Sequence, residues 1–364
     1  MTSTDATTFE VRPSSHPRSL AERTAALADL KFGVVFTDHM ARATWTDDEG
    51  WHDRRIEAYA PLSLDPAAAV LHYAQEIFEG LKAYRHADGS IWAFRPDRNA
   101  QRLARSAERL ALPVLSEADF HASIQALVAT DAEWVPSVPG SSLYLRPFMF
   151  ASEAFLGVRP ARRVDYLVIA SPVGPYFTNG FQPLSIWVDA EYNRAGPGGT
   201  GAAKCGGNYA ASLLPQAQAY KEGCDQVCFL DAATGTYLEE LGGMNVFLVM
   251  KDGSVRTPAL GTILEGVTRD SILQLCREGG RPVEESRIAL TELLEGIRAG
   301  EVTEVFACGT AAVITPIGRL KGTDFDVTIG DGQAGPVTTE LYETITDIQY
   351  GRREDAHGWM SRLV

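Results

Sequence analysis

The stretch GPGGTGAAKCGGNY, residues 196–209, surrounds one lysine, Lys204, with glycine, alanine and other small residues. A solvated loop lysine does not need small neighbours, because its side chain extends into water. A lysine that forms a Schiff base needs room for a flat ring beside its amine, and a pKa lowered by burial or by a nearby cation. The stretch therefore leaves two alternatives for Lys204, an ordinary loop lysine or a Schiff-base lysine.

Two phosphate-loop patterns can be tested on the same residues. Gly196, Gly198 and Gly201 fit G-x-G-x-x-G, but Pro197 lies inside the pattern, and AAKCGG follows it instead of a helix-forming run. The Walker pattern fails because Lys204 follows alanine rather than glycine and precedes cysteine rather than serine or threonine. The context disfavours a dinucleotide loop, and Lys204 is not a P-loop lysine.

Length, charge and hydropathy limit the classes of function. At about 100 to 200 residues per domain, 364 residues predict two domains. A net charge of -14 repels polyanions, so nucleic acid is not expected as a partner. The most apolar run, VFACGTAAVITPI from Val305, is shorter than the roughly 20 residues of a membrane-spanning helix, so no membrane partner is expected. Residues 1–30 contain no apolar secretory segment and are expected to form a flexible leader.

The cysteines and histidines indicate neither a disulfide framework nor a metal site. Five cysteines at irregular spacing predict free thiols in a reducing compartment, and hence a cytoplasmic protein. One pair has three intervening residues rather than the two of the usual metal or redox motif, and the seven histidines are scattered, so no metal is expected. The cysteines are Cys205, Cys224, Cys228, Cys276 and Cys308.

The first half of the chain is predicted to mix strands and helices. Strands are predicted at FGVVFTD from Phe32, IWAFRPD from Ile91, SLYLRPFMF from Ser142 and DYLVIASPV from Asp165. Helices are predicted at AAVLHYAQEIFEGLKAY from Ala67, RNAQRLARSAERL from Arg98 and EADFHASIQALVATDA from Glu117. The segment GPYFTNGFQP, residues 174–183, is typical of an interdomain linker. It would separate a small N-terminal α/β domain at 31–173 from a large C-terminal domain at 184–364.

The second half is predicted to begin with the strand PLSIWVDAEY from Pro183. After the lysine loop comes the helix NYAASLLPQAQAYKEG, which Pro215 can interrupt and Gly223 can stop. QVCFLD, TGTYLEE, MNVFLVM and SVRTPA predict an antiparallel meander. Two helices, VTRDSILQLCREGG and LTELLEGIRAG, precede the strand VTEVFACG. The fold class is therefore α/β of the α+β type, with two domains and mixed or antiparallel sheets.

Pyridoxal phosphate would require three groups besides a lysine: a carboxylate at the ring nitrogen, a donor at the ring oxygen and a phosphate site. YLEELGGMN offers Glu239 and Glu240, of which only one can point inward because neighbouring strand residues face opposite ways. Tyr209 is a candidate for the ring oxygen. By pattern alone, these residues could also be solvated hairpin acids and a core tyrosine.

The phosphate candidates lie in three segments. LEGVTRDS places a glycine ahead of a helix, so the amides of Val267 and Thr268 would point outward where anions bind. Gly309 and Thr310 in CGTAAV could supply further amides and a hydroxyl, and Arg102 could supply positive charge. Each candidate has an ordinary alternative: a helix cap, a turn and a surface arginine.

Taken together, these segments resemble the branched-chain amino-acid aminotransferases of PLP fold type IV, the class that includes aminodeoxychorismate lyase and D-amino-acid aminotransferase. The similarity runs in order through FGVVFTDHM, IFEGLKAYR, SLYLRPFM, GGTGAAKCGGNYAAS, EELGGMNVF, LEGVTRDS and CGTAAVITP. It implies a PLP-dependent enzyme that works by a ping-pong mechanism and transfers the amino group of L-leucine, L-isoleucine or L-valine to 2-oxoglutarate. The products would be the branched 2-oxo acid and L-glutamate. The resemblance also implies a homodimer.

The resemblance assigns the cofactor roles to matching positions. Lys204 would hold the cofactor as an internal aldimine and then move the proton between the substrate Cα and C4′. Glu240 would contact the pyridine nitrogen, with Glu239 as its outward neighbour, and Tyr209 would contact the ring oxygen. The phosphate site would consist of Arg102, Gly309, Thr310 and the amides of Val267 and Thr268.

The resemblance also implies a substrate site. Main-chain amides near Ala311, and Tyr73 of the second subunit, would hold the substrate carboxylate. The aliphatic side chain would lie in an apolar pocket, where each buried methylene is worth about 0.8 kcal/mol, and Arg146 would recognise the acidic partner. Mammalian relatives have threonine at the position of Gly243, so the resemblance does not assign one of the contacts on the side of the substrate carboxylate. The pocket would be lined by Phe36, Phe78 and Tyr144.

Two other functions stay open at this stage. A D-amino-acid transaminase or an aminodeoxychorismate lyase would share the fold, but neither is expected to contain the FTDHM and FEGLKAY segments. A non-catalytic small-molecule binder would keep the two domains without covalent chemistry, and it would not need the set of Lys204, Glu240, Tyr209 and Arg102.

Overall fold

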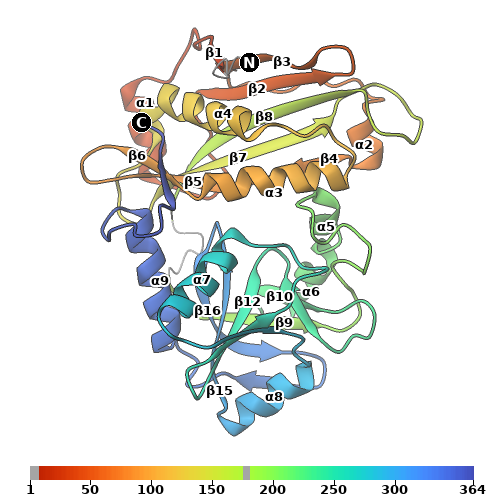
Figure 1. The fold of residues 1–364 in the computed structure, drawn as a ribbon, viewed down its shortest axis with the longest axis vertical. Coiled ribbons are helices and arrows are strands. Elements are labelled where there is room, and N and C mark those ends of the chain that lie inside the picture. Colours follow the sequence, from red (N-terminus) through yellow and green to blue (C-terminus); the bar gives the residue numbers. More distant parts are fainter. Residues whose placement is uncertain (1–7, 175–180) are drawn as a thin grey trace, which may run out of the picture. The chain divides into compact units, whose positions relative to one another are not determined.

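The computed structural model describes residues 8–174 and 181–364 (Figure 1). These residues form two compact units, which are described one at a time. Unit 1 contains residues 8–174, 203–206 and 347–364, and unit 2 contains residues 181–202 and 207–346. Of the predicted linker at 174–183, residues 175–180 lie outside the described residues, as do residues 1–7 of the predicted leader.

Unit 1 is built on one sheet with the strand order β1-β3-β2-β8-β7-β5-β6-β18, and β4 pairs with β7. β1 and β3 are parallel, and the pairs along the rest of the path are antiparallel. The strands are β1 (Glu10–Val11), β2 (His39–Thr46), β3 (Gly50–Ala58), β4 (Glu76–Phe78), β5 (Leu81–Arg85), β6 (Ile91–Phe94), β7 (Ser142–Ala151), β8 (Arg163–Val173) and β18 (Met360–Arg362). The helices are α1 (Leu20–Ala28), α2 (Ala69–Tyr73), α3 (Pro96–Arg109), α4 (Glu117–Thr130) and the 3-10 turn η1 (Ala132–Trp134).

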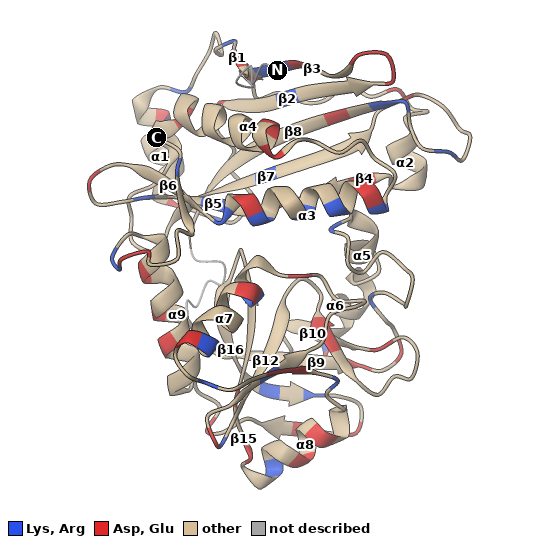
Figure 2. Ribbon diagram, in the orientation of Figure 1, with Lys and Arg blue, Asp and Glu red and all other residues tan. Residues whose placement is uncertain are grey.

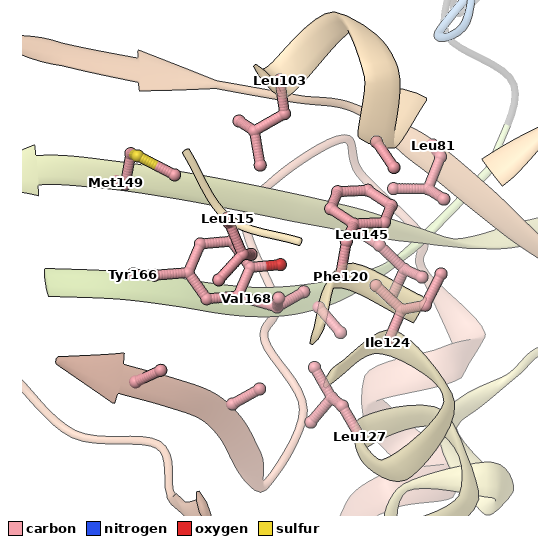
Figure 3. Close-up of a cluster of buried hydrophobic side chains, with 14 of the residues drawn as sticks. Leu81, Leu103, Leu115, Phe120, Ile124, Leu127, Leu145, Met149, Tyr166 and Val168 are labelled. Carbon is pink, nitrogen blue, oxygen red and sulfur yellow. The ribbon is translucent and has the colours of Figure 1, made fainter. Parts of the chain in front are cut away.

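Helices α3 and α4 begin at clear sequence signals and join the sheet in one apolar core. Pro96 occupies the start of α3, where its fixed φ suits a helix, and the Ser116 hydroxyl accepts a hydrogen bond from the Asp119 amide at the start of α4. Figure 3 shows Leu103 of α3 and Phe120 of α4 among the buried side chains of this core. Each such side chain stabilises the fold by about 1.5–3 kcal/mol, which holds α3 in a fixed position on the sheet.

Two sequence predictions for unit 1 were wrong. The segment from Ala67 contains the short helix α2 followed by β4 and β5, because the buried strands have no polar face and their apolar residues can be counted at helical spacing. α2 ends at Ala74, whose φ of 48° is left-handed. The segment FGVVFTD is a turn in which Gly33 has a φ of 69°, and the first long strand begins at His39.

Unit 2 is built on a mixed sheet with the strand order β11-β10-β9-β16-β15-β12-β13-β14, and β17 pairs with β16. β9 is parallel to β10 and β16, β13 is parallel to β14, and the other pairs are antiparallel. The strands are β9 (Leu184–Asp189), β10 (Gln226–Leu230), β11 (Leu238–Leu241), β12 (Asn245–Met250), β13 (Val255–Pro258), β14 (Val283–Ser286), β15 (Val302–Gly309), β16 (Val313–Lys321) and β17 (Asp326–Thr328). The remaining helices of the chain are α5 (Gly206–Ala210), α6 (Leu213–Lys221), α7 (Val267–Glu278), α8 (Leu290–Ala299) and α9 (Pro336–Gln349).

The predicted meander in unit 2 was wrong in its connectivity. β10 pairs with β11 and β12 pairs with β13, but β12 takes β15 as its other neighbour. Local patterns specify the strands but not the long-range pairing. The predicted helix is divided into α5 and α6, but the break lies at residues 211–212, and Pro215 itself lies in the first turn of α6. Gly223, with a φ of 73°, follows the end of α6 as predicted.

Surface charge and cysteine placement agree with the composition. Figure 2 shows acidic and basic segments interspersed in both units rather than gathered into one basic patch. The five cysteines are buried free thiols. Across residues 8–174 and 181–364, no helix has the length and apolar character needed to cross a membrane.

Candidate active site

Lys204 belongs to unit 1, where its main chain is bonded to α3 and β4. The Lys204 amide donates to the Ser106 hydroxyl at 3.0 Å, and the Lys204 carbonyl accepts from the Phe78 amide at 3.0 Å. The Nζ atom lies 4.8 Å from the centre of the Phe78 ring. The lysine is therefore fixed at both main-chain groups, and its amine lies against an aromatic face.

A second predicted residue, Arg146, lies at the same ring and joins it to Tyr144. The Arg146 guanidinium lies 4.7 Å from the centre of the Phe78 ring and 5.4 Å from that of Tyr144, and it donates to the Tyr144 hydroxyl at 3.1 Å. Gly80 permits this packing, since a Cβ at this position would overlap the Tyr144 hydroxyl. Unit 1 thus brings Lys204, Phe78, Tyr144 and Arg146 together.

Arg102 is buried on α3 and bound to a glutamate that the sequence analysis did not single out. Its Nε donates to Glu79 Oε1 at 2.8 Å and its Nη2 donates to Oε2 at 2.9 Å, while Asn99 Nδ2 also donates to Oε2 at 2.7 Å. Burial raises the pKa of Glu79, but Arg102, the hydrogen bonds and the charge of Lys204 together hold this pKa below its ordinary value. The only signal in the sequence was the position of Glu79 directly after Phe78.

The glycine after the lysine loop also has a specific role. The Gly206 amide donates to the Glu76 carboxylate, and a Cβ at Gly206 would overlap that carboxylate. Burial raises the pKa of Glu76, although the Gly206 hydrogen bond and Arg146 act in the opposite direction. Small residues around Lys204 therefore make close backbone contacts possible, in addition to leaving room at the amine.

Two other predicted residues of unit 1 make their contacts elsewhere. The Phe36 ring stacks on Tyr59 at 5.1 Å, whereas the nearby Phe32 packs edge-on against Tyr144 at 4.9 Å. Tyr73 is 41% exposed at the end of α2, and its hydroxyl donates to the Leu156 carbonyl. Phe32 was missed because it lies in a turn that the sequence analysis assigned to a strand.

In unit 2, Glu240 is buried on β11 and held by main-chain and side-chain donors. Arg194 Nη1 lies 2.8 Å from Glu240 Oε1, and the Leu264 amide donates to the same oxygen at 2.9 Å. Arg194 is itself fixed, because Nη1 also donates to the carbonyls of Gly201 and Thr262. Arg194 was missed, since no local pattern marks a partner so far away in the sequence.

Glu239, expected as the outward neighbour of Glu240, is also buried. Its exposed fraction is 5%, and Oε1 accepts a hydrogen bond from the Thr262 hydroxyl. Burial raises the pKa of Glu239, against the effects of Thr262 and Arg194. The two carboxylates on β11 therefore face different surroundings, and neither is a solvated hairpin acid.

The start of α7 fits an anion. Gly266 precedes Val267 and Thr268, and among the described residues no side chain caps this end of the helix, so its first amides suit a phosphate. A Cβ at Gly266 would overlap Asn245 Oδ1, and Asn245 Nδ2 donates to the Leu264 carbonyl at 3.1 Å. Asn245, which was also missed, thus links the helix start to the segment that holds Glu240.

The other predicted residues of unit 2 lie around the end of β15. Asn245 is paired with Cys308 in the ladder of β12 and β15, next to Gly309. A Cβ at Gly309 would lie 3.5 Å from the Gly243 carbonyl, and a Cβ at Gly243 would lie 3.5 Å from the Tyr209 ring. Tyr209, Gly243 and Gly309 are therefore neighbours, and Thr310 and Ala311 follow Gly309 in a turn.

These donors match what pyridoxal phosphate requires. Unit 1 supplies an amine at an aromatic face and a buried guanidinium, and unit 2 supplies a buried carboxylate, a phenol and a helix start that suits an anion. The lysine loop leaves unit 2 and returns to it between Thr200 and Asn208, whose side chains are joined by a hydrogen bond of 2.7 Å. The chemistry of the donor set therefore fits the cofactor.

Comparison with known proteins gives one family. The model of the family described as amino-transferase class IV matches residues 76–320. A relative from Mycolicibacterium smegmatis named branched-chain-amino-acid aminotransferase is 55% identical over 360 residues, which cover 98% of each chain. The branched-chain amino acid aminotransferase of Escherichia coli matches with a TM-score of 0.73 and 30% identity, over 89% of this chain and 100% of that one. The T.th. branched-chain amino acid aminotransferase solved with pyridoxamine 5'-phosphate also has a TM-score of 0.73, at 28% identity over 89% of this chain and 99% of that one.

Proposed function

The chain belongs to the class IV aminotransferases, and we propose that it transfers the amino group of L-leucine, L-isoleucine or L-valine to 2-oxoglutarate. It is a pyridoxal phosphate enzyme of the branched-chain aminotransferase type. The products are the branched 2-oxo acid and L-glutamate. Each turnover consists of two half-reactions that use the same site in succession.

The observation that carries this proposal is the group around the Phe78 ring. The amine of Lys204 and the guanidinium of Arg146 lie 4.8 and 4.7 Å from the centre of this ring. A branched aliphatic side chain needs an apolar wall, while glutamate needs a cation for its second carboxylate. Phe78 and Tyr144 supply the first requirement, and Arg146 supplies the second. Both substrates can therefore be recognised beside one reactive lysine.

Pyridoxal phosphate supplies an aldehyde that condenses with amines and a pyridine ring that withdraws electrons. Lys204 would hold the cofactor aldehyde, be displaced from it by the substrate amine, and then carry the proton removed from the substrate Cα. Glu240 would bind the pyridine nitrogen, with Arg194 and the Leu264 amide holding its carboxylate in place. Tyr209 would contact the ring oxygen. The phosphate would be held by Arg102, Gly309, Thr310 and the amides of Val267 and Thr268.

The test is an absorption spectrum of the purified holoenzyme before and after L-leucine, and again after 2-oxoglutarate. We expect the yellow band to bleach with leucine and to return with 2-oxoglutarate. A spectrum that does not respond to leucine would contradict the proposal. D-Alanine is the matched control, because a D-amino-acid transaminase would bleach with it instead.

The lysine itself can be identified by reduction with borohydride and peptide mapping. Lys204 should carry the reduced cofactor. Lys82 is the internal control, because it is buried and burial lowers its pKa to about 8, so it would compete for an aldehyde on reactivity alone. A label on Lys82, or no label at all, would rule out the assigned role of Lys204 and favour a non-catalytic binder.

We also infer a cytoplasmic homodimer. Five buried free thiols are consistent with a reducing compartment. The exposed position of Tyr73 at the end of α2 would let its side chain reach the substrate carboxylate of a second subunit. Light scattering should give twice the mass of the chain. If the protein is a monomer and still turns over leucine fully, Tyr73 cannot have the role in a partner's site that we assign to it.

A further inference from the structure

One carboxylate that the proposed reaction does not use, that of Glu76, lies beside the ring that Lys204 and Arg146 contact. Alternate residues of a strand project from the same side, so Glu76 and Phe78 share one face of β4. Phe78 is paired with Phe148 of β7, and Arg146 lies two residues before Phe148 on the same face. The Arg146 guanidinium lies 4.7 Å from the centre of the Phe78 ring. Glu76, Phe78 and Arg146 are therefore neighbours on one face of the sheet in unit 1.

Glu76 is held in place on this face by the lysine loop. Its carboxylate accepts a hydrogen bond from the amide of Gly206, which lies two residues after Lys204. Glu76, Phe78 and Arg146 each keep some exposed surface, so none of the three is enclosed in the core. The carboxylate thus has a fixed position at a face that a ligand can reach.

Arg146 and Glu76 interact through their charges without forming an ion pair. Among the described residues, the contacts of Arg146 are the Tyr144 hydroxyl and the rings of Phe78 and Tyr144, and no carboxylate lies within ion-pair distance of it. Burial raises the pKa of Glu76, and the charge of Arg146 acts in the opposite direction. Arg146 can therefore bind a ligand carboxylate, while Glu76 reduces the positive field that this carboxylate meets.

This arrangement affects the choice between the two substrates. Under the proposed function, a branched aliphatic side chain and the second carboxylate of glutamate occupy the same site in turn. A guanidinium with no opposing charge would favour the dicarboxylate, and L-glutamate formed in one half-reaction would then hold the site against the branched substrate. A neighbouring carboxylate weakens the dicarboxylate selectively, because its charge acts on the acidic side chain and not on the aliphatic one.

We propose that Glu76 is a specificity-determining residue, whose negative charge beside Arg146 weakens binding of the acidic substrate and leaves binding of the branched substrate unchanged. This inference rests on the proposed function, since it concerns the same substrate site. The hydrogen bond from Gly206 has a separate effect, which is to hold the end of the lysine loop. Removal of the charge alone should improve affinity for a dicarboxylate, whereas a loss of structure would weaken the binding of every ligand.

The experiment is isothermal titration calorimetry of the pyridoxal phosphate holoenzyme with glutarate and with 4-methylpentanoate. These acids are glutamate and leucine without the amino group, so they can occupy the substrate site without reacting. A buffer of about pH 8 is well above the ordinary pKa of carboxyl groups. Glu76→Gln keeps the size of the side chain and an oxygen that can accept from Gly206. In this variant we expect glutarate to bind about three- to tenfold more tightly, and 4-methylpentanoate to bind as in the wild type.

Three further variants separate charge from structure. Glu76→Ala removes both the charge and the acceptor, so both acids should bind more weakly than in Glu76→Gln, with the ratio of affinities still shifted toward glutarate. Glu76→Asp keeps the charge and should keep the wild-type ratio. Glu133→Gln removes an exposed carboxylate of η1 and should change neither affinity.

An unchanged ratio of the two affinities in Glu76→Gln would overturn the proposal. An equal shift for both acids would also overturn it, because Glu76 would then have only a structural role. If Glu76→Gln does not fold, the ratio in Glu76→Ala decides the matter. Absence of glutarate binding to the unmodified holoenzyme would count against the proposal as well. Leucine bleaching of the unmodified enzyme tests the proposed function separately, so this inference can fail while the amino-transfer reaction stands.

Discussion

Replacement of Glu79 by glutamine should destabilise unit 1 strongly. Glu79 has no exposed surface, and both of its oxygens bind the buried guanidinium of Arg102. Glutamine keeps the size but removes the charge, so Arg102 loses its counter-ion while it stays buried. Breaking a buried ion pair in this way costs about 3–5 kcal/mol. For a unit of this size, about 2–4 °C per kcal/mol predicts a Tm lower by about 6–20 °C.

Thermal unfolding of the apoenzyme followed by circular dichroism measures this change. Glu133→Gln is the control, because its carboxylate is 77% exposed and lies 4.0 Å from Arg23, so little change is expected. Burial is the largest single effect and raises the pKa of Glu79, but Arg102, Lys204 and Asn99 together leave it below the ordinary 4.5. The pair therefore stabilises the fold above pH 4.5, and the difference between wild type and variant should shrink in acid. A Tm within about 2 °C of wild type at neutral pH would refute the reasoning.

Three further changes test unit 2. Arg194→Met should lower the free energy of unfolding by about 3–5 kcal/mol in a denaturant titration, because Glu240 stays buried without its cation. Asn245→Ala leaves the Leu264 carbonyl without its donor and should cost about 1–3 kcal/mol, with faster loss of cofactor on dialysis. Burial raises the pKa of Glu239 above 4.5, so the wild type loses stability as pH rises through that range. Glutamine does not titrate, so the Tm of Glu239→Gln should rise relative to that of the wild type as the pH is raised.

The sequence predicted elements best where a single local signal decides the structure. α3 and α4 have strong starts and apolar faces, β7 is rich in aromatic residues and leucine, and β8 is rich in β-branched residues. The segment from Ala67 failed because β4 has only three residues, too few to show a strand pattern, and β5 is buried on both faces. The meander failed for a different reason, since the pairing of β12 with β15 is a tertiary choice.

The predicted site residues divide in the same way, into those that a local motif identifies and those that depend on distant contacts. Lys204, Phe78, Tyr144 and Arg146 were named from motifs. In unit 1, Lys204 and Arg146 lie against the Phe78 ring, and Arg146 also lies against Tyr144. Their supporting partners were not named, because their function depends on contacts that no local pattern contains. Glu79 is separated from Arg102 by 23 positions, and no spacing rule joins them. A motif therefore identifies groups of chemical interest but not the counter-ions that make their burial possible.

The two neighbouring glutamates of β11 show why alternation alone does not assign burial. Glu239 and Glu240 point to opposite sides of the strand, yet one short segment reaches both. The Thr262 side chain donates to Glu239, and the Leu264 amide donates to Glu240. The Thr262 carbonyl also accepts from Arg194, which binds Glu240. A displacement of residues 262–264 would therefore act on both carboxylates, which belong to one hydrogen-bonded network.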